Sequence, residues 1–220
     1  MSDKKPIIVF VHGLWMNGLE LAFLRWRVKQ NGFVTTQFNY HSVTHSIEAN
    51  VTKLAAFVHE LDSSSVHFVA HSLGGLVVLR LFEEFPDLPH GRIVLLGSPV
   101  RGSKVARILT GIKGGTYLLG KSVEAGLVQD RDPYWDGRRD LGVIAGTLGL
   151  SVVRLLHRLE GPNDGTIAVE ETRIDGMKDF LTLNVTHTTM VFSPQVANEI
   201  AHFLDYGHFS TARQTSGSVS

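Results

Sequence analysis

The sequence predicts an α/β fold, with a mainly parallel sheet of about six strands and helices on both of its faces. Short apolar runs alternate along the chain with stretches of helical periodicity. Most of these runs are continuously apolar, as are strands that a parallel sheet buries on both sides. Alternating strands and helices return to one sheet by right-handed crossovers, so the pattern favours a single parallel sheet.

Six segments have the composition of buried strands, because they are short, apolar and rich in β-branched residues. In chain order they are 7–11, 33–40, 66–70, 92–96, 141–145 and 180–185. Sheets of this kind bind ligands at the carboxyl ends of their strands. We therefore expect the functional residues in the loops that follow these segments.

Two helices are predicted from their periodicity and their end signals. Residues 47–61 carry apolar side chains at spacings of three and four, which is one face of an amphipathic helix. The last helix has Ser193 as its N-cap, Pro194 in its first turn and Gly207 as its stop.

Length and composition favour one globular domain. The chain has 220 residues, of which 43% are hydrophobic, and this is enough for one large core. We expect a single domain over residues 1–208 and a flexible polar tail over 209–220. Basic and acidic residues balance at 21 each, so no overall field attracts nucleic acid or an anionic membrane.

The absence of cysteine excludes disulfides, thiolate metal sites and a cysteine nucleophile. The first apolar run, 7–11, is too short for a signal-peptide core or a membrane span, and no later stretch reaches spanning length. The sequence therefore predicts no integral membrane segment. We expect a cytoplasmic location, unless a leader was removed before this sequence begins.

The stretch 66–85, VHFVAHSLGGLVVLRLFEEF, combines a strand, a turn and an apolar helix. This is the context of a nucleophile elbow, in which a sharp, strained turn exposes a serine at the edge of the sheet. Ser72 occupies that position, and Ala70 and Gly74 are the small neighbours that such a turn needs. Gly75 should then let the helix pack close to the sheet.

Three further stretches accompany the elbow: VHGLW at 11–15, LEGPNDGTIAVEET at 159–172 and VTHTTMVFSPQVANEIAHFL at 185–204. With them the chain resembles the α/β-hydrolase superfamily, specifically the small bacterial lipases and esterases whose elbow carries alanine in place of its first glycine. The resemblance covers residues 6–206. It implies an α/β-hydrolase fold with a small cap or none.

The resemblance also implies a catalytic triad of Ser72, Asp164 and His187, in that family's order along the chain. Within such a triad the imidazole takes the serine proton during attack, and the carboxylate fixes the imidazole tautomer. The backbone amides of Leu14 and Leu73 would form the oxyanion hole. Acyl transfer of this kind needs no cofactor.

Other residues compete for two of these roles. Asp175 and Asp179 are alternatives for the acid, although 163–165, Asn-Asp-Gly, lies after the fifth predicted strand as the family's acid loop does. His202 and His208 are alternatives for the base, but they fall within or beyond the last helix.

Four other histidines lie near the predicted site or have a spacing that could bind a metal. We expect His12 to support the oxyanion loop through hydrogen bonds, and His71 to point away from the site on the elbow turn. His41 and His45 have a spacing that could chelate a metal on a helix, but nothing nearby completes a site, so we predict no metal.

Residues 101–140 are longer than a simple crossover helix. Two apolar helical faces in this segment could form a small cap over an acyl pocket, or could pack on the sheet as ordinary core; the sequence leaves both open. Tyr134 and Trp135 are equally undecided.

The leading functional hypothesis is a serine hydrolase that cleaves carboxylic esters, an esterase or lipase acting through an acyl-enzyme. Its partner would be a small-molecule or lipid ester, and the oligomeric state is not indicated. A thioesterase or acyltransferase on the same fold is an alternative. A second alternative is a binding protein that has lost catalysis.

Overall fold

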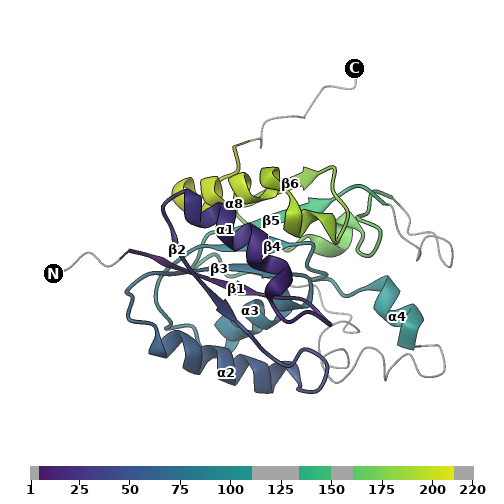
Figure 1. Cartoon of the computed structure of the whole chain (residues 1–220). Helices are drawn as coiled ribbons and strands as arrows, with labels where there is room; N and C mark the ends of the chain where they lie inside the picture. The colour runs from purple at the N-terminus through teal and green to yellow at the C-terminus, as the bar shows by residue number, and fades with distance from the viewer. Residues whose placement is uncertain (1–4, 111–133, 150–160, 211–220) are drawn as a thin grey trace.

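The computed structural model describes residues 5–110, 134–149 and 161–210. Within these ranges six parallel strands form one open sheet in the order β2-β1-β3-β4-β5-β6, which confirms the predicted fold class (Figure 1). The strands are β1 (Ile7–Val11), β2 (Val34–Phe38), β3 (Val66–His71), β4 (Ile93–Leu96), β5 (Leu141–Gly146) and β6 (Asp179–Leu183).

Helices cover both faces of the sheet (Figure 1). They are α1 (Ala22–Gln30), α2 (Ile47–Glu60), α3 (Leu73–Glu84), α4 (Lys104–Thr110) and α8 (Pro194–Tyr206), with short 3-10 helices η1 (Leu19–Leu21), η2 (Val169–Thr172) and η3 (Thr189–Phe192). The helices α2 and α3 pack on one face and α1 and α8 on the other, so the sheet separates two apolar cores. No helix in the described ranges is long and apolar enough to cross a membrane.

Alternation along β3 sends its side chains into both cores. Phe68 and Ala70 belong to the core under α2 and α3, whereas Val69 belongs to the core under α1 and α8. All six residues of β3 are buried, which explains why its sequence is nearly continuously apolar. The strand also runs one residue further than predicted, through His71.

The predicted ends of the last helix are confirmed, and α2 has an N-cap that was not predicted. Ser46 caps α2 and Ser193 caps α8, each through a side-chain oxygen that accepts a backbone N–H three residues later at 3.3 Å. Gly207 ends α8 with a φ of 76°, a left-handed conformation that favours glycine.

The packed domain extends past the predicted boundary at residue 208. The side chain of Phe209 is 1% exposed and packs against Phe203, and its amide donates to Asp179 Oδ2 at 2.7 Å. The amide of Ser210 donates to the buried Glu199 carboxylate at 2.8 Å. The tail therefore cannot begin at residue 209, because an aromatic side chain there completes the core; residues 211–220 lie outside the described ranges.

The segment 101–140 is described at its two ends only, because 111–133 lies outside the described ranges. At its start, the buried carboxylate of Glu171 accepts the amides of Lys104 at 2.6 Å and Ala168 at 2.8 Å, and so joins the start of α4 to η2. At its end, Trp135 is 5% exposed and packs edge-on against Phe82, so this tryptophan belongs to the core. Tyr134 is exposed.

Burial of His67 makes stability depend on pH. Its Nδ1 accepts the Arg92 amide at 2.8 Å, and burial, followed by the charge of Arg92, lowers its pKa from 6.5 to about 4. Between these values the unfolded chain binds a proton that the folded chain does not. The free energy of unfolding should therefore fall as the pH falls through this window, by about 3 kcal/mol from this residue.

We expect His67→Asn to lose less stability than the wild type between pH 6.5 and 4, because asparagine keeps an acceptor for Arg92 but does not titrate. Urea unfolding at a series of pH values measures this difference. Parallel pH profiles for the two proteins would contradict the assignment. The buried His71 contributes equally to both proteins and cancels in the comparison.

Candidate active site

Ser72 lies at the junction of β3 and α3, at the carboxyl edge of the sheet. Its φ of 52° and ψ of −124° place a non-glycine residue in a strained conformation, which typically costs about 1–3 kcal/mol. Its amide donates to the Leu96 carbonyl at 2.9 Å, so the neighbouring strand β4 holds the turn in place. Such strain at an exposed edge is the backbone geometry that a nucleophile elbow requires.

The glycines after Ser72 allow this turn because backbone and side chains crowd them. A Cβ at Gly74 would lie 2.5 Å from the carbonyl oxygen of His12 and 2.6 Å from that of Val11. A Cβ at Gly75 would overlap the hydroxyl of Ser98. The first turn of α3 thus packs directly against the ends of β1 and β4, as expected for Gly75.

Asp164 and His187 come together from two separate loops. The His187 Nδ1 and Asp164 Oδ2 atoms lie 2.7 Å apart, and the His187 amide donates to the Asp164 carbonyl at 2.9 Å. The other carboxylate oxygen of Asp164 accepts the amides of Thr166 at 2.9 Å and Ile167 at 2.7 Å. With its side chain 1% exposed, the carboxylate is oriented toward the imidazole by these donors.

The competing residues are engaged elsewhere. Asp175 pairs with Arg101 at 3.3 Å, and Asp179 accepts the Phe209 amide. His202 Nδ1 donates to the carbonyl of His208 at 2.8 Å. The geometry therefore favours Asp164 and His187 over the alternatives that the sequence left open.

The elbow and the Asp164–His187 pair meet at the end of β4. Leu96 accepts the Ser72 amide, and a Cβ on the following Gly97 would lie 3.1 Å from Asp164 Oδ2 and 3.2 Å from His187 Nδ1. No hydrogen bond joins the Ser72 hydroxyl to His187 in the described part of the chain. Without substrate, hydrogen bonds of this kind are often long and tighten only in the reacting complex.

The loop after β1 lies against the elbow. A Cβ at Gly13 would lie 3.1 Å from the Ser72 Cβ, so the loop approaches the candidate nucleophile at the residue before Leu14. Leu73 is the first residue of α3, so its amide has no acceptor within the helix and is available to an anion. The loop that carries Leu14 and the helix start that carries Leu73 thus both adjoin Ser72, and the oxyanion-hole role of the two amides stays a prediction.

His12 supports this loop as predicted. Its ring stacks on Tyr40 with 4.3 Å between centroids, and its carbonyl accepts the Tyr40 hydroxyl at 2.7 Å. Burial lowers the pKa of His12, which keeps the ring neutral. These contacts tie the end of β1, and with it the start of the loop, to the chain after β2.

The side chain of His71 does not point in the predicted direction. Instead of pointing away from the site, its ring packs on that of His187 with 4.8 Å between centroids, and its Nε2 lies 3.1 Å from the His187 carbonyl oxygen. The reason is that β3 includes His71, so its side chain follows strand alternation and leaves the sheet on the same face as Val69. Extending the predicted strand by one residue would have revealed this direction from the sequence.

A cavity of about 490 Å³ opens beside the loop after β1. Its walls come from this loop and from the chain after β2, and carry no Asp, Glu, Lys or Arg side chain. The lining residues are His12, Trp15, Met16, Asn17, Asn39, Tyr40, His41, Ser42, Val43 and Thr44. Trp15 has a φ of 59°, which is a strained backbone conformation for a residue other than glycine, and it is 59% exposed. The loop therefore presents an exposed indole side chain at the cavity.

The rings of His41 and His45 stack with 4.9 Å between centroids. In the ranges that the structure describes, no group of three or more histidine, aspartate and glutamate side chains could hold a metal ion.

The fold and this arrangement of loops define an α/β hydrolase, and the chain belongs to the alpha/beta hydrolase family, whose model matches residues 8–192. The mature form of the Bacillus licheniformis lipase BlEst2 superposes with a TM-score of 0.71 at 18% identity, over 94% of this chain and 93% of that one. The metagenomic carboxyl esterase MGS0156 superposes with a TM-score of 0.64 at 20% sequence identity, over 86% of this chain and 67% of that one. The monoacylglycerol lipase of Paleococcus ferrophilus superposes with a TM-score of 0.58 at 16% sequence identity, over 91% of this chain and 93% of that one.

At these identities the structural likeness establishes the fold, and the residues of the site must support the chemistry. A search of curated protein sequences finds no match.

Proposed function

We propose that the protein is a serine hydrolase that cleaves carboxylic esters through an acyl-enzyme. The observation that carries the proposal is the partly buried contact of 2.7 Å between His187 Nδ1 and Asp164 Oδ2, near a serine in a strained elbow. Ser72 is the nucleophile, His187 the general base and Asp164 the group that orients it.

In the first half-reaction the Ser72 Oγ attacks the ester carbonyl carbon while its proton moves to His187 Nε2. Asp164 accepts a hydrogen bond from Nδ1–H, which leaves Nε2 as the free base and stabilises the imidazolium that forms. The amides of Leu14 and Leu73 donate to the developing oxyanion. Collapse expels the alcohol, which takes the proton from His187, and water repeats the sequence to release the acid.

The strand order supports a placement of the two halves of the ester on opposite sides of Ser72. The leaving alcohol must lie near His187, whose loop follows β6, because it receives its proton there. The acyl group then extends toward β1 and β2, where the cavity beside Trp15 opens. A cavity without charged side chains suits an uncharged acyl group of moderate length.

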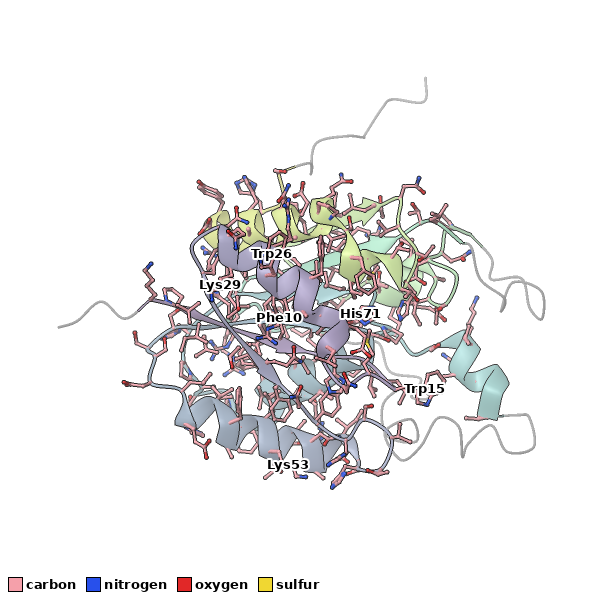
Figure 2. All side chains as sticks on the ribbon, viewed as in Figure 1. Phe10, Trp15, Trp26, Lys29, Lys53 and His71 are labelled. Carbon is pink, nitrogen blue, oxygen red and sulfur yellow. The ribbon has the colours of Figure 1, made fainter. Side chains whose placement is uncertain are left out.

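Trp15→Ala should lower kcat/KM for p-nitrophenyl hexanoate about 10-fold while p-nitrophenyl acetate changes less than about twofold, because only the longer acyl chain reaches the indole. Trp26→Ala is the matched control, since Trp26 is similarly exposed, at 55%, but lies on α1 (Figure 2). A hydrolysis assay over a series of acyl lengths gives the comparison. Equal losses for acetate and hexanoate would place the acyl group elsewhere.

A fluorophosphonate probe tests the function itself, because only an activated serine is phosphonylated. We expect a single adduct on the peptide that contains Ser72, and no adduct in Ser72→Ala. Absence of labelling in the wild type would favour the binding-protein alternative. Competition between an ester and the thioester of the same acid, both assayed for kcat/KM, separates the esterase from the thioesterase.

A further inference from the structure

The side chain of His71 contacts several parts of the candidate site. It directly precedes Ser72, its ring packs on His187, and a Cβ at Gly13 of the oxyanion loop would lie 3.2 Å from its Nδ1. One imidazole thus adjoins the nucleophile, the base and the oxyanion loop. Figure 2 places His71 at the end of the sheet where Trp15 also lies.

The tautomer of His71 follows from its partners. A carbonyl oxygen only accepts, so Nε2, at 3.1 Å from the His187 carbonyl, must carry a proton and donate it. Burial, and then the neighbouring His187, lower the pKa of His71 to about 3, so the ring is neutral and Nδ1 is an unprotonated acceptor. A neutral ring does not oppose the positive charge that His187 gains during catalysis.

Nδ1 has no hydrogen-bond partner among the described residues, although the side chain is 2% exposed. An unpaired buried acceptor destabilises the fold, and a phenylalanine or leucine would fill the same space without one. Packing alone therefore does not account for a histidine here, whereas the hydrogen bond from Nε2 does.

His187 is held from two directions. Asp164 fixes it from the acid loop through the imidazole Nδ1 and the backbone amide, and His71 fixes it from the elbow through the backbone carbonyl. The contact from His71 comes from the residue next to Ser72, so it sets the base relative to the nucleophile. This matters because a misplacement of about 1 Å between reacting groups can cost about 100-fold in rate.

We propose that His71 is a positioning residue that sets the distance between His187 and Ser72 through its Nε2–H bond to the His187 carbonyl. The inference rests on the proposed function, since it assigns these two residues their roles. It adds a fourth side chain, which acts through the base and touches no substrate.

Two variants separate the hydrogen bond from the ring. His71→Phe keeps a ring of similar size and removes the donor, whereas His71→Gln can place its amide nitrogen near the position of Nε2 and keep the donor. We expect His71→Phe to lower kcat for a p-nitrophenyl ester about 10- to 100-fold, with KM within about twofold. His71→Gln should retain kcat within about fivefold of the wild type.

A proton NMR measurement on the resting protein supplies a readout that does not depend on turnover. The proton between His187 Nδ1 and Asp164 should give a downfield resonance in the wild type and in His71→Gln, and a shifted or broadened one in His71→Phe. Thermal unfolding of each variant shows that the comparison is made on folded protein.

The proposal is overturned if His71→Phe keeps the wild-type kcat and resonance, or if both variants lose activity equally while remaining folded. A wild type that hydrolyses no ester would instead contradict the proposed function, and the resonance would still test the contact between His71 and His187.

Discussion

Ser72→Ala is expected to lower kcat for a p-nitrophenyl ester by about 10⁵- to 10⁶-fold, because removing the nucleophile abolishes the acyl-enzyme route and leaves only oxyanion stabilisation and binding. The fold should persist, since alanine keeps the backbone of the elbow and the Ser72 hydroxyl makes no hydrogen bond to His187 in the described part of the chain. Steady-state kinetics and thermal unfolding on the same preparation measure both effects.

Ser193→Ala is the matched control. Ser193 caps α8 far along the chain from the elbow, so its loss should cost about 1 kcal/mol of stability and leave kcat unchanged. Activity that survives in Ser72→Ala would remove this serine from the mechanism, whatever the control shows.

Asp164→Asn is expected to lower kcat by about 10⁴-fold. An asparagine can keep one oxygen for the amides of Thr166 and Ile167, which preserves the loop. It then presents an amide N–H to His187 Nδ1, which favours the tautomer whose Nε2 is protonated and cannot accept the proton of Ser72. The measurement is kcat near neutral pH, with circular dichroism to confirm the fold.

Asp175→Asn is the matched control for Asp164→Asn. Asp175 is exposed and pairs with Arg101, and a surface pair of this kind contributes about 0–1 kcal/mol. We expect its kcat to match that of the wild type. Similar losses in the two variants would mean that Asp164 acts only through general electrostatics.

The sheet could be predicted from the sequence because β3, β4 and β5 are buried at every position, and burial on both faces leaves a continuous apolar signature. The ends of the strands were harder to predict than the sheet itself. β2 stops at Phe38, before the predicted end at residue 40, because the chain there turns to stack Tyr40 on His12, and that contact joins segments 28 residues apart.

The part of the candidate site that depends on local sequence could be predicted. The strained turn at Ser72 has a local signature in its small neighbours, and the resemblance supplied Asp164 and His187. The position of the His71 side chain was missed because it depends on whether β3 ends at Ala70 or one residue later, which decides the face of the sheet on which the side chain lies. The cavity beside Trp15 was also missed, since it forms between two loops that no sequence pattern links.

The contact between Asp164 and His187 has a consequence for biosynthesis. The elbow is made within the first third of the chain, but the imidazole follows β6, the edge strand, and is held by a loop that follows β5. During translation Ser72 therefore emerges from the ribosome long before Asp164 and His187. On the proposed function, a nascent chain would lack esterase activity until the loops that carry Asp164 and His187 have been synthesised and have docked against the elbow.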